Sequence, residues 1–149
     1  MKIYLAADHA GFAHKEALKK ALYEKQYEVE DFGAHSLDVN DDYPVFIKKA
    51  ASMLSRNPEN RAVLFGGSGE GEAIAANRFP NVRAAVFYGG TGEIVKLSRE
   101  HNNANALSIG ARFIVEKEAL EAIFLWLSTP FSGEERHSRR IEQIDERAL

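Results

Sequence analysis

Short apolar runs alternate along the chain with longer segments in which apolar residues recur at helical spacing. The runs have the length and composition of buried strands, and they cover residues 2–7, 27–32, 61–65, 83–88 and 106–109. Apolar positions three and four residues apart, bounded by proline and glycine, predict helices over 13–25, 44–56, 72–79, 93–100 and 116–127. A final helix is predicted over residues 134–149.

Strands that alternate with helices predict a parallel sheet, because parallel neighbours require crossover connections. The pattern therefore indicates an α/β fold with five parallel strands and helices on both faces of the sheet. The 149 residues, of which 45% are hydrophobic, are enough for a single domain over residues 1–149 with one core.

Composition narrows the classes of function. The 22 acidic and 19 basic side chains give a formal charge of −3, which provides no general attraction for nucleic acid or for an anionic membrane. The absence of cysteine excludes a disulfide scaffold, a thiolate metal site and a cysteine nucleophile. The chain starts on a strand-like run and has no apolar stretch near ~20 residues, so we expect a cytoplasmic protein without a membrane partner.

Polar and glycine-rich segments follow the predicted strands. They are DHAGF at 8–12, GGSGEGE at 66–72, YGGTGE at 88–93 and GAR at 110–112, and HNN at 101–103 comes just before the last strand. Functional groups of parallel sheets gather at the carboxyl ends of the strands. We therefore expect glycine, histidine, carboxylate and arginine from these segments to converge on one edge of the sheet.

The segment 61–77, RAVLFGGSGEGEAIAAN, runs from a buried strand through glycines into an Ala-rich helix. Such a loop presents backbone N–H groups to an anion, although a flexible turn is the simple alternative. The loop lacks the third glycine of a dinucleotide-binding loop and the Lys-Ser/Thr ending of a P-loop, and Glu70 stands where a serine-hydrolase elbow needs glycine. Its carboxylates, Glu70 and Glu72, would repel a pyrophosphate.

Glu72 has two interpretations. A carboxylate in the first turn of a helix stabilises that helix by ~0.3–1 kcal/mol through the helix dipole. The same position places the carboxylate over a nest of N–H donors, as expected of a base that removes a carbon-bound proton while an oxyanion forms alongside. The pairs Asp8-His9 and His101-Asn102 likewise fit either the ends of helices or a functional site.

The predicted last helix carries Arg136 and Arg140 four residues apart, beside a row formed by His137, Ile141 and Ile144. A solvated basic face explains such a run. A fork of arginines beside a histidine also suits a phosphate monoester dianion, and a helix at the end of the chain could reach its own pocket or that of a neighbouring subunit.

A metal site is not favoured by the sequence. The histidines weighed as ligands lie far apart, without H-x-x-x-H spacing: His9, His35, His101 and His137. No cysteine accompanies them.

Six motifs occur in an order that resembles the B-type ribose-5-phosphate isomerases, the family that also includes allose-6-phosphate and galactose-6-phosphate isomerases. The motifs are ADHAGF at 7–12, DDYP at 41–44, GGSGEGEAIAAN at 66–77, REHNNAN at 99–105, GAR at 110–112 and RHSRRI at 136–141. The resemblance implies a three-layer, Rossmann-like α/β/α sandwich on a five-stranded parallel sheet. It also implies a homodimer or a dimer of dimers, with active sites shared across the interface by the C-terminal helix, and no metal or organic cofactor.

The resemblance implies an aldose–ketose isomerase that acts on ribose 5-phosphate by ring opening and enediolate proton transfer. Glu72 matches the proton-shuttling base of one branch of the family, whereas the other branch uses a cysteine at the position of Gly66. The catalytic matches are Glu72, Ser68, His101 and Asp8. The substrate-binding matches are His9, Tyr43, Gly67, Gly69, Glu70, Gly71, Asn102, Arg112, Arg136, His137 and Arg140. Of these, the resemblance assigns the phosphate to His9 and the three arginines, with His137 beside them.

The segment Tyr88–Glu93 is more glycine-rich than the resemblance leads us to expect, and we expect it to border the carbon chain of the sugar. Two alternatives therefore stay open. One is the isomerisation of a six-carbon substrate, allose 6-phosphate or galactose 6-phosphate, and the other is a sugar-phosphate-binding module without turnover.

Overall fold

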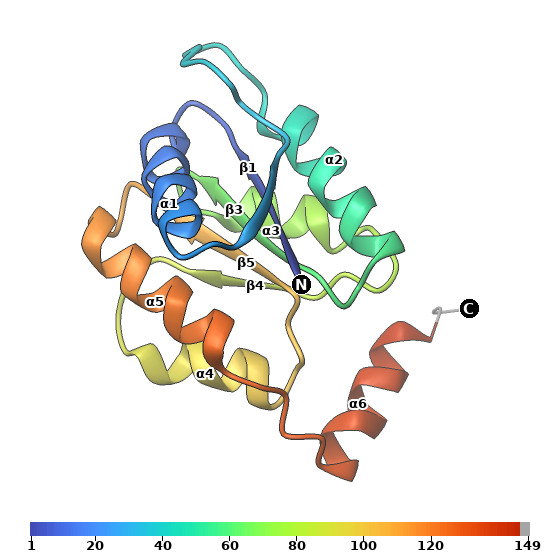
Figure 1. The fold of residues 1–149 in the computed structure, drawn as a ribbon. Helices are drawn as coiled ribbons and strands as arrows, with labels where there is room; N and C mark the ends of the chain where they lie inside the picture. The colour runs from blue at the N-terminus through green and yellow to red at the C-terminus, as the bar shows by residue number, and fades with distance from the viewer. Residues whose placement is uncertain (147–149) are drawn as a thin grey trace.

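A five-stranded parallel sheet with the strand order β2-β1-β3-β5-β4 forms the centre of the computed structural model, which describes residues 1–146 (Figure 1). The strands are β1 (Lys2–Ala7), β2 (Glu28–Asp31), β3 (Arg61–Gly66), β4 (Ala84–Phe87) and β5 (Ala106–Gly110). Every pairing between neighbours is parallel. The predicted fold class is confirmed, and the insertion of β5 between β3 and β4 is a feature that the sequence pattern does not indicate.

Helices cover both faces of the sheet. They are α1 (Phe12–Glu24), α2 (Tyr43–Arg56), α3 (Glu70–Ala76), α4 (Gly92–Glu100), α5 (Glu116–Ser128) and α6 (Glu135–Asp145). Side chains alternate between the faces of each strand. In β1, Ile3 and Leu5 pack with α1, α4 and α5, whereas Tyr4 and Ala6 pack with α2 and α3. The result is the expected three-layer α/β/α arrangement.

The bounds of α1, α2, α4 and α5 match the prediction to within one residue, whereas those of α3 and α6 differ by more. α3 begins at Glu70, before the predicted start at Glu72, because Gly69 adopts a left-handed φ of 79° at the N-cap. Glu72 therefore lies inside the first turn of α3. α6 ends at Asp145, and residues 147–149 of the predicted helix lie outside the described residues.

The strands all begin at one side of the sheet, here called the amino edge, and all end at the opposite side, the carboxyl edge. These two sides carry different parts of the chain. The strands in Figure 1 point away from α6, which stands beyond the edge at which the strands begin. Arg83, just before β4, forms an ion pair of 3.3 Å with Asp145 of α6, and the Ser132 N–H donates to Glu100 O at 3.1 Å. Across residues 1–146, no helix combines the length and the apolar character that spanning a bilayer requires.

Candidate active site

The glycine loop after β3 holds Glu72 in a buried position. Only 3% of Glu72 is exposed, and a Cβ built on Gly66 would overlap its carboxylate. The carboxylate thus fills the space that a side chain at residue 66 would need. Burial raises the pKa of Glu72 above its ordinary value of 4.5, and the nearby Asp8 carboxylate adds to this shift. A carboxylate with a raised pKa is suited to accept and return a proton.

Contacts from several elements fix the shape of this loop. Buried Ser108 of β5 donates from Oγ to the Gly69 carbonyl oxygen at 2.6 Å. The backbone N–H of Arg112 donates to Gly67 O at 3.1 Å, and the Arg112 guanidinium lies against Gly67. A Cβ on Gly71 would come within 2.7 Å of the Tyr43 ring, so the start of α2 packs closely on the loop. The loop is therefore held as a rigid unit rather than as a flexible turn.

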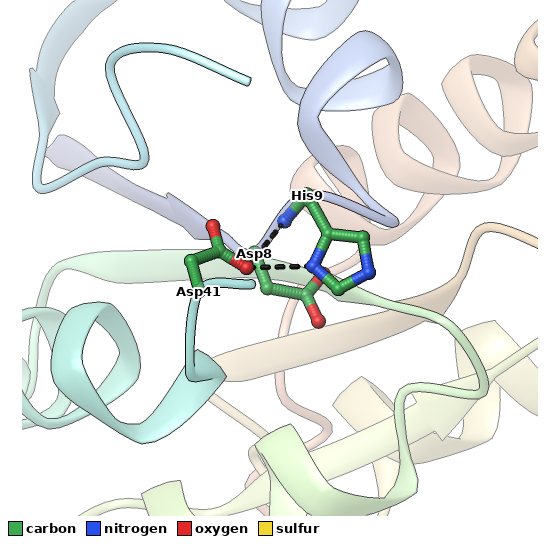
Figure 2. A group of neighbouring side chains, drawn as sticks. All are labelled: Asp8, His9 and Asp41. Carbon is green, nitrogen blue, oxygen red and sulfur yellow. Dashed lines mark hydrogen bonds and ion pairs between the residues drawn. The ribbon is translucent and has the colours of Figure 1, made fainter. Parts of the chain in front are cut away.

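The turn after β1 places Asp8 and His9 at the same edge of the sheet. Asp8 is 7% exposed, and its Oδ1 accepts the N–H groups of Ala10 and Gly11 at 3.0 and 3.2 Å. The Asp41 carboxylate, which comes from the loop before α2, reaches over His9 (Figure 2). Asp41 Oδ1 accepts the His9 backbone N–H at 3.0 Å and lies 2.6 Å from His9 Nδ1.

The same three side chains are the residues in the described part of the chain that could hold a metal ion, with ligand atoms within 4.8 Å of one another. The 2.6 Å separation between His9 Nδ1 and Asp41 Oδ1 is that of a charge-assisted hydrogen bond. Two ligands about 2.0 Å from a tetrahedral ion would stand roughly 3.3 Å apart. The geometry favours a hydrogen-bonded pair over a metal centre.

The predicted convergence of all segments on one edge is wrong. Asp8, His9, Tyr43, Gly66–Glu72 and Arg112 form a carboxyl-edge group, but His101 and Asn102 lie at the opposite edge. They follow α4 and precede β5, and Asn105 N–H donates to Arg83 O just before β4. β5 has five residues, so roughly 13 Å of strand separates the two groups. A segment that precedes a parallel strand must lie at the amino end of that strand. The order of His101 and Asn102 before β5 therefore already indicated their position.

His101 stacks on His137 of α6, with ring centroids 4.2 Å apart and an angle of 15° between the planes. His137 is 4% exposed, and its Nε2 has no hydrogen-bond partner among residues 1–146. Burial, then the neighbouring His101 and Arg136, lower the pKa of His137. Within the described chain, His137 is buried and packs against the His101 ring.

The remaining predicted residues of α6 are accessible. Arg136 and Arg140 are exposed, and Arg136 Nε donates to Glu134 Oε2 at 2.9 Å. Together with His101, Asn102 and His137 they form an amino-edge group. The structure of one chain thus brings the predicted residues together as two separate groups.

Sequence reasoning assigned no role to Arg99, which holds the loop carrying His101 and Asn102. Arg99 is 2% exposed and donates to Thr129 O, Asn103 Oδ1 and Ala104 O at 3.2, 2.8 and 2.6 Å. Burial, followed by the charges of Arg61 and Arg83, lowers its pKa to about 10. The position of Arg99 in the REHNNAN motif was the one feature of the sequence that indicated a role for it.

Asp41 and Ser108 were also without a predicted role. Ser108 interrupts an otherwise apolar strand, and Asp41 belongs to the DDYP motif. Each acts through a partner far away in the sequence, so only the folded chain reveals the contact.

Comparison with known proteins identifies the family of this chain. Residues 3–144 match the family described as ribose/galactose isomerase. The chain belongs to the ribose/galactose isomerase family. Among curated relatives, the ribose-5-phosphate isomerase B of Mycolicibacterium paratuberculosis is 40% identical over 146 residues, which cover 98% of this chain and 91% of that protein.

Solved structures of the family share the fold. The ribose-5-phosphate isomerase B of Mycoplasma genitalium, solved with bound ribulose 5-phosphate, has a TM-score of 0.92 and 34% identity, over 97% of this chain and 93% of that chain. The ribose 5-phosphate isomerase of Thermotoga maritima has a TM-score of 0.91 and 42% identity, over 98% of both chains. The resemblance found in the motifs is confirmed, and the protein is an aldose–ketose isomerase by family.

Proposed function

We propose that this protein interconverts ribose 5-phosphate and ribulose 5-phosphate. The observation that carries the proposal is the Glu72 carboxylate, buried beside Gly66 at the start of α3 with a raised pKa. The relatives named ribose-5-phosphate isomerase B, and the relative that binds ribulose 5-phosphate, support this choice of substrate. A cytoplasmic location belongs to the same proposal, because charged sugar phosphates do not cross membranes unaided.

In the proposed reaction, Glu72 removes the proton from C2 of the open-chain aldose. The electrons of the C2–H bond form the C1–C2 double bond, and the carbonyl oxygen on C1 gains negative charge. The N–H groups of Gly67–Gly71 and the Ser68 hydroxyl stabilise this charge. Glu72 then returns the proton to C1 while the hydroxyl proton on O2 passes to O1. C1 is reduced and C2 is oxidised within one molecule, so no redox cofactor takes part.

The other roles divide between the two edges of the sheet. At the carboxyl edge, Asp8 binds substrate hydroxyls, and His9 and Arg112 bind the phosphate. At the amino edge, His101 assists ring opening, with Asn102 beside it, and Arg136 and Arg140 bind the phosphate. A single chain keeps these groups apart, so we propose a homodimer in which the amino-edge group of one protomer completes the site of its partner.

Features along β4 support an interface there. β4 is an edge strand, and such edges are usually covered in native proteins. Hollows of 210 and 390 Å³ lie beside it, both lined by Ala85, Ser98 and Asn102. Ile94 and Ile144, which line one hollow each, are exposed in the isolated chain. A second copy of this chain would cover this apolar surface and bring Asn102 to a shared site.

Isomerisation in heavy water tests the proposed function. We expect ribulose 5-phosphate to form with deuterium at C1, and Glu72→Gln to lower kcat about 10³-fold with KM little changed. Glu116→Gln is the matched control, because Glu116 is an exposed carboxylate in the first turn of α5. If the wild-type protein forms no ribulose 5-phosphate and incorporates no deuterium, the proposal is refuted. A higher kcat/KM with allose 6-phosphate than with ribose 5-phosphate would assign the six-carbon alternative.

A further inference from the structure

We propose that Asp41 is a positioning residue that holds the His9 ring in the orientation needed to bind the substrate phosphate. This inference deepens the proposed function and rests on it, because it takes the phosphate as the group that His9 binds. It assigns a task to a buried carboxylate that is not otherwise used in the reaction.

Among the hydrogen bonds of residues 1–146, those of the Asp41 side chain are directed at His9 alone. One oxygen, Oδ1, receives both the backbone N–H of His9 at 3.0 Å and the ring Nδ1 at 2.6 Å. The Asp41 side chain is 8% exposed, and its Oδ2 has no hydrogen-bond partner in the described chain. A carboxylate is costly to bury, so the short contact with His9 has to compensate much of that cost.

Asp41 determines which ring nitrogen of His9 is left for a ligand. An ionised carboxylate only accepts hydrogen bonds, so Nδ1 must carry a hydrogen in this pair. Figure 2 shows the second ring nitrogen pointing away from Asp41, and 26% of the His9 side chain is exposed. The free nitrogen, Nε2, is therefore the one that faces an incoming group.

A phosphate oxygen accepts a hydrogen bond from Nε2 when the bound ring carries hydrogen on both of its nitrogens. Asp41 Oδ1, 2.6 Å from Nδ1, accepts the Nδ1–H of that form and holds the ring on the side away from the ligand. The bond to the backbone N–H fixes the ring's point of attachment at the same time. Asp41 thus prepares His9 for a dianionic ligand before the ligand arrives, which lowers the ordering cost of binding.

Kinetics of Asp41 variants test the assignment. We expect Asp41→Ala to raise KM for ribose 5-phosphate and the inhibition constant of inorganic phosphate about tenfold, with kcat within about twofold of wild type. For Asp41→Asn, both constants should lie between those of wild type and Asp41→Ala, because the amide oxygen accepts both hydrogen bonds but carries no charge. Asp42→Ala is the control, since the neighbouring Asp42 is exposed and makes no side-chain bond to the start of α2 in the described chain.

Equal KM values for Asp41→Ala and Asp42→Ala would overturn the proposal, and so would a loss confined to kcat. Nitrogen-15 NMR of the His9 ring provides a readout that does not depend on turnover. The wild-type protein should show an Nδ1–H engaged in a short hydrogen bond with Asp41, and Asp41→Ala should lose the signature of that bond. An unchanged ring spectrum refutes the role of Asp41, whereas absent isomerase activity with a changed spectrum refutes only the proposed reaction.

Discussion

At the scale of single residues, the chemistry of the carboxyl edge depends on a missing side chain. Gly66 leaves room for the Glu72 carboxylate, and no other residue type at this position would do so without displacing it. The carboxylate is thereby removed from water, and its pKa rises. Local geometry and acidity are therefore set by the same contact.

The raised pKa of Glu72 predicts the acid limb of the activity profile. The base must be ionised to accept a proton, so kcat should fall as pH decreases through a pKa above 4.5. Measuring kcat from pH 4 to 8 tests this expectation. A profile that is flat down to the ordinary pKa of glutamic acid would contradict it.

The stability of the folded protein should also depend on the ionisation of Glu72, but it should decrease as pH rises. Ionisation of Glu72 is costlier in the folded protein than in the unfolded chain, so this destabilising contribution grows as pH rises from 4.5 through the folded pKa. Glu72→Gln, which removes the charge, should gain stability relative to wild type over that interval. Denaturant titrations at several pH values measure the difference.

At the scale of elements, an ion cluster attaches α1 to β2 inside an otherwise apolar layer. The Lys15 side chain is fully buried, and its Nζ lies 2.6 Å from Asp31 and 2.8 Å from Glu16. Lys19 adds a second contact to Asp31 at 2.8 Å. Burial alone would raise the pKa of Asp31, but hydrogen bonds from Lys15, Lys19 and the Gly33 N–H outweigh it and lower the pKa below 3.8.

Removing Asp31 should weaken this attachment strongly. Asp31→Asn leaves the buried Lys15 ammonium without its closest counter-charge, and we expect a loss of about 3 kcal/mol in the free energy of unfolding. Lys15→Met combined with Asp31→Asn should recover most of the loss, because the buried charge is gone. Urea denaturation compares the single and double variants, and equal stabilities for the two would contradict this account.

The contribution of this ion cluster to stability should decrease in acid. The pKa of Asp31 is lower in the folded protein than in the unfolded chain, so its stabilising contribution is present above 3.8 and is lost as pH falls through the folded pKa. Wild type should therefore lose its advantage over Asp31→Asn in acid.

At the scale of the whole molecule, the sheet keeps the two halves of the proposed site on opposite edges. The buried base and the glycine loop lie at one edge, and the His101–His137 stack and the arginines of α6 lie at the other. A chain built in this way is expected to act as an assembly of copies. The proposed dimer would place two complete sites at its interface.

Mixing two inactive variants tests the shared site. Glu72→Gln damages the carboxyl-edge group, and His101→Ala damages the amino-edge group. Random pairing after joint refolding should restore about a quarter of wild-type activity, because half of the dimers are mixed and each contains one intact site. Activity no greater than the sum of the separate variants would show that each site is formed within one chain.

Most of the elements could be predicted from the sequence, because the periods of strands and helices, together with glycine and proline at their ends, are local properties. The position of Glu72 at a helix start after a glycine loop was equally local. The predicted placement of His101 is wrong for a different reason, because the segment that carries it precedes β5 and therefore lies at the amino end of that strand.

The sequence by itself determined the class of fold, the glycine loop with its carboxylate, and the family to which the motifs belong. Tertiary structure alone decided the strand order, the overlap of Glu72 with the space beside Gly66, the bond from Asp41 to His9 and the stack of His101 on His137. These features join residues that are distant along the chain or depend on the packing of side chains in three dimensions. Their formation is governed by long-range packing, which no local period of the sequence records.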